Sequence, residues 1–386
     1  MSRTFNRYTP FAGISTAVLF ALLTTGAWAS VPNNVAEMIQ DGDDNTATIV
    51  QAPDPDGIRL EAYINQAGDY NYATITQNDS SAYNVATIDQ SGDGNSADLS
   101  QSWYSVYNEA TVNQGGDYNT AWVSQNDSSV ANYATIDQSG DGNSAGVSQS
   151  WDSEYNHASV DQSGDYNNTW ISQNDSSQGN TATVNQSGDE NSAEVSQSYG
   201  AGYNDATVDQ SGDYNIASID QDGSLYNVAE VDQSGNSNDA TVIQREESEG
   251  NYAMIDQSGD GNSATVSQDY HSFYNHATID QSGDYNSATI EQNYDSADNY
   301  ASVDQSGNDN SAEIFQSDYA QYNEATVNQS GNYNSATILQ NESMDNVAHV
   351  DQSGDGNLAF VNMVGHEYDA VTVMQVGNGN VAQYNP

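Results

Sequence analysis

The sequence repeats itself at a nearly constant interval, and each repeat contains two seven-residue segments in which small or aliphatic residues alternate with polar ones. The general form is N-x-A-x-φ-x-Q-x-G-x-x-N-x-A-x-φ-x-Q, where φ is aliphatic in nearly every repeat. Alternation with a period of two, bounded by Gly and Asp, indicates β-strands and argues against helices. Self-similarity at a fixed period of this length restricts the chain to a repeat architecture.

Fifteen such repeats follow one another without gaps inside the motif. Two strands per repeat, joined by a tight turn, predict an all-β fold: a β-solenoid of about 15 stacked strand-turn-strand rungs over residues 30–386. The invariant Gly of each repeat is typical of a turn residue with positive φ. The repeats begin at residues 34, 60, 84, 108, 132, 156, 180, 204, 227, 251, 275, 299, 323, 346 and 369.

Each repeat places amide side chains on the same strand face as its aliphatic side chains. In a stack of like rungs, each side chain lies ~4.7 Å above its own copy, so that one Gln amide can donate to the amide oxygen of the next. A buried amide is costly alone but is satisfied in such a column. We therefore predict a core that includes amide columns. The predicted members are Gln66, Asn71, Gln90, Asn95, Gln114, Asn119, Gln138, Asn143, Gln162, Asn167, Gln186, Asn191, Gln210 and Asn215.

The charge of the chain excludes several classes of partner. The formal net charge is −51, there is no Lys, and the only cations besides His are four Arg. Nucleic acids and anionic membrane surfaces are bound through clustered cations, so neither is an expected partner. The chain has no Cys, which excludes disulfides and thiol chemistry.

The segment 1–29 differs in composition from all that follows. Arg3 and Arg7 precede an apolar run over 11–23, which is followed by small residues. This pattern predicts a Sec signal peptide over 1–29, cleaved between Ala29 and Ser30. The apolar run is too short to span a bilayer, so we expect no membrane insertion of the mature chain.

The repeat motif resembles the curlin repeat, and residues 34–386 resemble the subunits of curli, the bacterial amyloid fibre. The last repeat, VTVMQVGNGNVAQYNP (371–386), is similar to the closing repeat of the major curli subunit. The resemblance implies a secreted structural subunit of extracellular fibres at the bacterial cell surface, cross-β-like on polymerisation, that serves the biofilm matrix and adhesion. It also implies three partners: further copies of the chain, a nucleator subunit and an outer-membrane secretion channel. By the same resemblance, polymerisation is seeded at the terminal rungs, through Gln40, Asn45, Gln375 and Asn380.

The chain also departs from the best-known members of this family. It has many more repeats than the major subunit, so it resembles an enlarged relative, and it has no Lys. Only the residues SVPN separate the predicted cleavage site from the first repeat. The targeting segment of the family is therefore nearly absent, which leaves the secretion route open.

Acidic residues follow the turn Gly in each of the first eight repeats, whereas four of the last seven have Asn there. Like charges stacked rung upon rung repel, so we predict that these carboxylates moderate aggregation. The last repeat has few charges and is therefore expected to be the end at which assembly starts. The predicted moderating residues are Asp93, Asp117, Asp141, Asp165, Asp189 and Asp213.

Other functions fit the sequence less well. The pattern predicts no enzyme and no cofactor, because the two Arg beyond the signal peptide are many repeats apart. Four GDGN turns leave loose divalent cation binding open. The alternatives are a minor nucleator subunit and an ice- or calcium-binding adhesin. Aromatic residues recur in every second repeat, and the sequence alone does not separate a duplicated two-rung unit from a functional aromatic stripe.

Overall fold

The structure is a computed structural model that describes residues 34–52 and 59–386. The predicted signal peptide, with Ala29 and Ser30, lies outside the described residues. The chain divides into two compact units, one ending at Gly179 and the other running from Asn180 to Pro386. In the described part of both units, every regular element is a β-strand. No helix that is long and apolar enough to cross a membrane occurs there.

Unit 1 has twelve strands. They are β1 (Val35–Asp41), β2 (Thr46–Gln51), β3 (Glu61–Ala67), β4 (Tyr72–Gln77), β5 (Val85–Gln90), β6 (Ser96–Ser100), β7 (Glu109–Gln114), β8 (Thr120–Ser124), β9 (Tyr133–Gln138), β10 (Ser144–Ser148), β11 (His157–Gln162) and β12 (Asn168–Ser172).

Unit 2 has eighteen strands. They are β13 (Thr181–Gln186), β14 (Ser192–Ser196), β15 (Asp205–Gln210), β16 (Ile216–Asp220), β17 (Val228–Gln233), β18 (Asp239–Ile243), β19 (Tyr252–Gln257), β20 (Ser263–Ser267), β21 (His276–Gln281), β22 (Ser287–Glu291), β23 (Tyr300–Gln305), β24 (Ser311–Phe315), β25 (Glu324–Gln329), β26 (Ser335–Leu339), β27 (Val347–Ser353), β28 (Leu358–Asn362), β29 (Ala370–Val376) and β30 (Val381–Tyr384).

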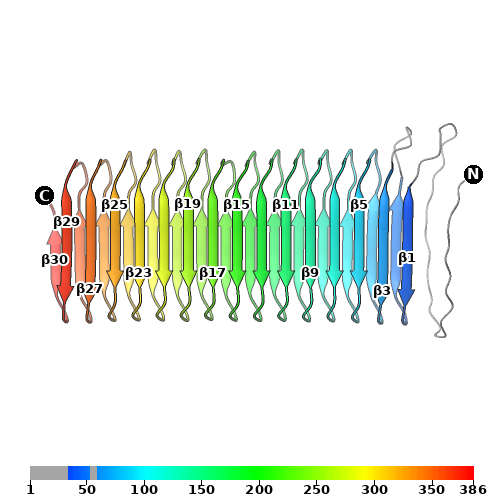
Figure 1. Cartoon of the computed structure of the whole chain (residues 1–386), viewed down its shortest axis with the longest axis horizontal. Coiled ribbons are helices and arrows are strands. Elements are labelled where there is room, and N and C mark those ends of the chain that lie inside the picture. Colours follow the sequence, from blue (N-terminus) through cyan, green and yellow to red (C-terminus); the bar gives the residue numbers. More distant parts are fainter. Residues whose placement is uncertain (1–33, 53–58) are drawn as a thin grey trace, which may run out of the picture. The chain divides into compact units, whose positions relative to one another are not determined.

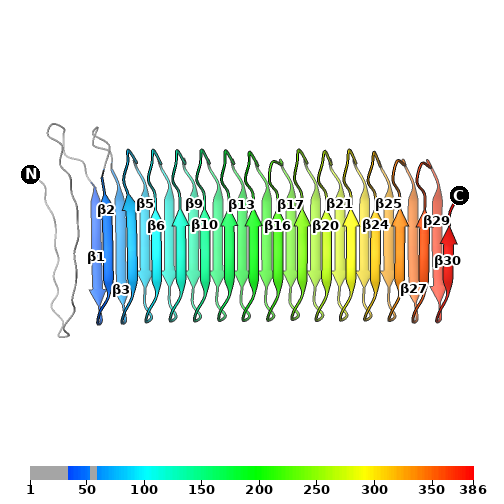
Figure 2. The same cartoon turned by 180° about the vertical axis from the view of Figure 1, so that it is seen from behind.

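Within each unit the odd-numbered strands form one parallel sheet and the even-numbered strands form another. One odd and one even strand make a rung, so unit 1 has six rungs and unit 2 has nine. Figure 1 shows the odd-numbered strands of each unit side by side, and Figure 2 shows the same strands from behind. The pairing aligns equivalent residues, as where Ala86, Ile88 and Gln90 of β5 oppose Ala110, Val112 and Gln114 of β7. The predicted all-β solenoid fold is confirmed.

The core lies between the two sheets of each unit and is built from alternate residues of every strand. In the strands between the end strands β1, β29 and β30, Ala and Ile, Val or Leu at these positions are almost completely buried, for example Ala86, Ile88, Ala97 and Leu99. Small Ala side chains beside branched ones let two sheets pack about 10 Å apart. The polar residues between them point outward, which is the arrangement that the period of two predicts.

Two kinds of arc join the strands. We call the four residues between the first Gln and the second Asn of a repeat, such as 91–94, the Gly arc. The residues between the second Gln of one repeat and the start of the next, such as 102–107, are the linker arc. The Gly arc has four residues in all fifteen repeats, whereas the linker arc has five, six or eight.

The invariant Gly is required for a different reason from the one expected. Gly92, Gly116 and Gly140 do not have positive φ. A Cβ atom at Gly92 would lie 1.9 Å from the carbonyl oxygen of Gly116, and one at Gly116 would lie 2.0 Å from that of Gly140. The sequence expectation of a positive φ is therefore wrong for these rungs, whereas Gly42, Gly68, Gly354 and Gly377 do have positive φ. Gly is needed because successive Gly arcs stack backbone on backbone.

Positive φ occurs two residues later in the Gly arc, where Gly and Tyr alternate over four successive repeats of unit 1. Gly94, Tyr118, Gly142 and Tyr166 have φ values of 68°, 58°, 67° and 58°. The ring of Tyr118 lies over Gly94, where a Cβ atom would be 2.8 Å from its Cδ1. Tyr166 covers Gly142 in the same way. Each Tyr thus occupies the space that the preceding Gly leaves, which gives the alternation between successive repeats a packing reason.

Candidate functional site: amide columns and end rungs

The first Gln of each repeat forms a column of amide hydrogen bonds inside each unit. Nε2 of Gln90 donates to Oε1 of Gln114 at 2.7 Å, and Gln114 donates to Gln138 at 2.9 Å. In unit 2 the column runs from Gln186 through Gln210 to Gln375, with every N···O distance at 2.8 or 2.9 Å. Gln66, Gln90, Gln114, Gln138, Gln162, Gln186 and Gln210 are all buried.

The second proton of each of these amides connects the two sheets. Nε2 of Gln90, at the end of β5, also donates to the carbonyl of Tyr72 at the start of β4, at 3.0 Å. Gln257 of β19 donates likewise to the carbonyl of Asp239 on β18. One side chain therefore joins its own column and holds the facing sheet, so its removal would leave several buried groups without partners.

The second Asn of each repeat forms a column of another kind. Oδ1 of Asn95 accepts the backbone N–H of Asn119 at 2.8 Å, while its Nδ2 donates to the carbonyl of Gly116 at 2.7 Å. The same pair of bonds recurs at Asn71, Asn119 and, in unit 2, at Asn215. The other predicted Asn positions, Asn143, Asn167 and Asn191, are equally buried and lie in the same columns. These Asn side chains fix the Gly arcs to one another.

Two further amide columns were not among the predicted site residues. The second Gln of each repeat forms a column from Gln51 to Gln173 in unit 1 and from Gln197 to Gln340 in unit 2. The unit 2 column ends where Met363 replaces Gln. The first Asn forms another, as where Asn84 Oδ1 accepts the N–H of Asn108. Both residues are part of the repeat motif, so the signal for them was present in the sequence.

The acidic residue after the turn Gly has a structural role that its charge did not reveal. Oδ1 of Asp93 accepts the backbone N–H of Asp69 at 2.7 Å, and Oδ1 of Asp117 accepts that of Asp93 at 2.8 Å. Asp141, Asp165 and Asp213 accept from the preceding rung in the same way. Asn236 replaces Asp in this role without loss of the hydrogen bond. Asp and Asn are thus interchangeable hydrogen-bond acceptors at this position. Asp189 occupies the same position in its own repeat, directly after the turn Gly.

A second acidic column lies on the outer face of the odd-numbered strands. Burial raises the pKa of Asp161, and the nearby carboxylate of Asp137 raises it further. Burial followed by the flanking carboxylates likewise raises the pKa of Asp256 and of Asp280. Protonation of this column is therefore favoured by stacking, since the neutral form is the less costly one in a row of like charges.

The end rungs of the described chain differ from the interior rungs in their partners. Gln40 donates to Gln66 at 2.7 Å, and Asn45 donates to the carbonyl of Gly68 at 2.6 Å. At the other end, Gln375 accepts from Gln352 and donates to the carbonyl of Leu358, and Asn380 donates to Asn357. β29 and β30 are the last strands of their sheets in unit 2. Among the described residues, no further rung pairs with these two strands.

The last rung also has an exposed apolar surface. Met374, Val376 and Val381 are 68%, 73% and 75% exposed. In most other repeats, Asp or Asn occupies the position of Met374 and Ser that of Val376. An unpaired strand edge combined with exposed apolar side chains favours association with another edge.

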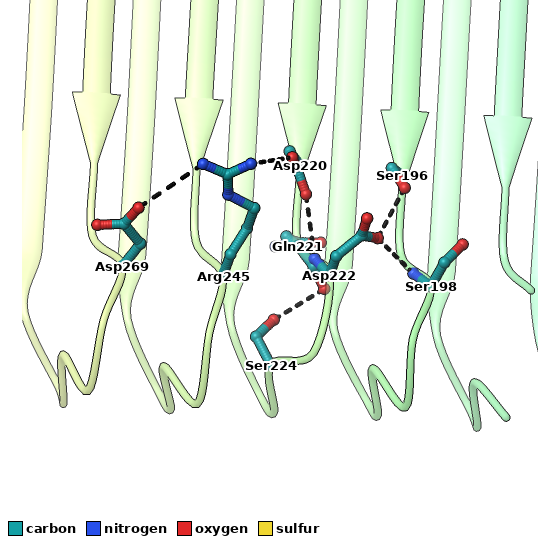
Figure 3. A network of polar contacts seen from close by, with 8 residues as sticks. All are labelled: Ser196, Ser198, Asp220, Gln221, Asp222, Ser224, Arg245 and Asp269. Atoms are coloured by element: carbon teal, nitrogen blue, oxygen red, sulfur yellow. Dashed lines mark hydrogen bonds and ion pairs between the residues drawn. The ribbon is translucent and has the colours of Figure 1, made fainter. Parts of the chain in front are cut away.

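One cluster of charges at the linker arcs of unit 2 includes the cation Arg245 (Figure 3). Arg245 lies between Asp220, at 3.2 Å, and Asp269, at 3.8 Å. Burial raises the pKa of Asp269 to about 6; Arg245 lowers it, whereas Glu246 and Glu291 raise it. Asp222 accepts hydrogen bonds from the Ser196 hydroxyl and the Ser198 N–H. The described residues contain no group of three or more His, Cys, Asp or Glu side chains that could hold a metal ion.

Parallel rungs, in-register amide columns and repeated Gly arcs define the class of this protein as a β-solenoid repeat protein with a partly polar core. The family described as the curlin associated repeat matches residues 130–150, 203–224, 249–269 and 297–331. These segments of the chain are therefore curlin associated repeats, and that repeat family is structural rather than enzymatic. A search of the curated proteins found no match.

Proposed function

We propose that this protein is the structural subunit of a curli-like extracellular amyloid fibre and that it polymerises by stacking the end rung of one copy on that of another. The observation that carries the proposal is the last rung, where an open strand edge coincides with the exposed side chains of Met374 and Val376. A further copy would extend the backbone pairing and the Gln column at Gln375. Stacking one end on the other gives an open, non-closing polymer.

In this proposal the protein is secreted to the bacterial cell surface, where its fibres contribute to the biofilm matrix and to adhesion. A nucleator subunit and an outer-membrane channel are its proposed partners. The high negative charge keeps soluble copies apart, because like charges repel over a screening length of ~10 Å at 0.1 M salt. We therefore expect assembly to become faster as the salt concentration rises.

The test converts the last rung into an interior rung. The double variant Met374→Asp/Val376→Ser introduces the residues that most other repeats have at these positions. We expect the monomer to remain folded and the lag phase of fibre formation, followed with an amyloid-binding dye, to lengthen several-fold. Fibres of the unmodified chain should show a meridional reflection at ~4.7 Å, the spacing of paired strands.

The matched control deletes residues 275–298, which form one interior rung. The deletion connects equivalent positions of two repeats and leaves both end rungs intact. This deletion should keep the lag phase close to that of the full chain, whereas deletion of residues 364–386 should lengthen it. An unchanged lag in the end-rung variants, or an equal delay in the interior deletion, would overturn the proposal.

A further inference from the structure

The outer face of the even-numbered strands in unit 1 holds a pair of stacked Trp side chains. Trp122 on β8 and Trp170 on β12 both oppose Gly146 on the strand between them. Strands pair about 4.8 Å apart, which places the two Trp backbones roughly 9.6 Å apart. Their ring centroids are nevertheless only 5.5 Å apart, and the ring planes differ by 8°. The two rings therefore lean toward each other above Gly146.

Gly146 makes this arrangement possible. A Cβ atom at this position would lie 2.5 Å from Cε3 and Cζ3 of Trp170. The missing side chain leaves a shallow hollow beside the rings, which we call the Trp groove. It is lined by Thr120, Trp122, Ser144, Gly146, Asn168 and Trp170. Trp170 is 42% exposed, so its indole is accessible from solvent.

The chemistry of the Trp groove is unlike that of the molecule around it. The chain has 55 acidic residues, yet none of the described residues that line the groove is acidic. Two indoles supply an apolar surface, and Thr120 and Ser144 are exposed beside them with hydroxyl groups. Along the strand register, Asp98 on β6 opposes Trp122, and burial raises the pKa of this carboxyl group.

These features select one class of ligand. Binding sites combine an apolar surface with a few well-placed polar groups. A sugar ring offers an apolar C–H face and several hydroxyl groups, and a neutral polysaccharide carries no charge for the acidic chain to repel. Another copy of this protein would bring a net charge of −51 against a surface of the same sign. Polyanionic glycans are disfavoured for the same reason.

We propose that the Trp groove binds a neutral polysaccharide, with sugar rings against the indoles of Trp122 and Trp170 and sugar hydroxyls bonded to Thr120 and Ser144. The groove lies on a strand face and not on an end rung, so the proposal is independent of polymerisation.

The experiment measures depletion of the soluble full chain by insoluble cellulose and by chitin, two neutral polysaccharides. We expect the double variant Trp122→Ala/Trp170→Ala to lose affinity at least about tenfold, as removal of two aromatic contacts allows. The matched control is Trp103→Ala/Trp151→Ala. These two Trp are also two repeats apart and are more exposed, but they lie in linker arcs outside the groove. The control should bind within about twofold of the unmodified chain.

A second variant distinguishes a change in the groove from a general loss of folding. Gly146→Ala keeps both indoles but forces the Trp170 ring off the strand, and it should weaken binding several-fold while the β-sheet circular dichroism is unchanged. Four results would overturn the proposal: no depletion of the unmodified chain, undiminished binding by the Trp122/Trp170 variant, equal loss in the Trp103/Trp151 control, or self-association through the groove in place of glycan binding.

Discussion

The two arcs of each rung differ in how far their length and sequence vary between repeats. The Gly arc keeps four residues in all fifteen repeats. The Asp or Asn after its Gly, and the Asn that follows the arc, hydrogen-bond to the backbone of the neighbouring rung. The linker arc varies between five and eight residues and carries Trp, Tyr, Arg or His in different repeats. The residue type is most constant where a side chain hydrogen-bonds to the neighbouring rung or where two backbones stack without room for a side chain.

The largest difference between the arcs should come from Gly→Ala substitutions. A Cβ atom at Gly235 of the Gly arc would lie 1.9 Å from the carbonyl oxygen of Gly259. Because that obstacle is backbone, we expect Gly235→Ala to lower the free energy of unfolding by about 3 kcal/mol or more. Gly200 of the linker arc has φ of 81° and open space around it, so Gly200→Ala should cost only about 1–2 kcal/mol.

Urea unfolding of freshly prepared monomer, below the concentration at which fibres form, measures both values. Equal losses would show that the stacked backbone of the Gly arc does not constrain the chain as described.

The Gln that precedes the Gly arc should come next in magnitude. Gln257 accepts from Gln233 and donates to Gln281 and to the carbonyl of Asp239. Gln257→Ala leaves these buried groups without partners and should cost about 2–4 kcal/mol, since each unsatisfied group costs about 1–3 kcal/mol. Hydrogen exchange of the neighbouring strands should quicken accordingly. Gln321→Ala in a linker arc is the control, with an expected change within about 0.5 kcal/mol; a similar loss there would contradict the comparison.

Lowering the pH should change the contribution of one buried linker-arc carboxylate to the stability of the fold. The pKa of Asp269 is raised to about 6, so its ionised form destabilises the fold at neutral pH. That cost is relieved as the pH falls through about 6 toward the unfolded carboxyl value near 4. Asp269→Ser, which introduces the residue found at this position in several other repeats, should therefore stabilise the chain at pH 7 by roughly 1–3 kcal/mol.

The same variant should have a flatter dependence of stability on pH between 4 and 7. If the unmodified chain instead loses stability as the pH falls over this range, the conclusion that the ionised Asp269 carboxylate destabilises the fold is wrong.

The smallest effect concerns the aromatic stacks of the linker arcs. Tyr83 and Tyr107 lie with ring centroids 4.8 Å apart and planes within 3°. Tyr107→Ala should cost about 0.5–1.5 kcal/mol, the contribution of an aromatic pair. Tyr107→Phe keeps the ring and should leave the unfolding midpoint unchanged; a loss in the Phe variant as large as that in the Ala variant would exclude ring stacking as the cause.

The sequence pattern was sufficient to predict the strands, their two faces and the buried amides, because a period of two inside a longer fixed repeat leaves few other arrangements. It could not show why Gly is invariant, because a requirement for positive φ and a lack of space between stacked rungs both select Gly. The pattern also could not show whether Asp93 is present for its charge or as a hydrogen-bond acceptor, because the same carboxylate has both properties. The Arg245–Asp269 pair and the Trp groove depend on residues that occur once or twice, so repetition gave no signal for them.

The orientation of the Gln side chains has a consequence for any stack of these rungs. In each column Nε2 donates to the Gln that follows in the chain, so the amide dipoles of a column all point the same way. Two molecules meeting head to head would bring donor against donor or acceptor against acceptor. A filament built on these columns is therefore vectorial, and its two tips must differ in the rate at which they add new molecules.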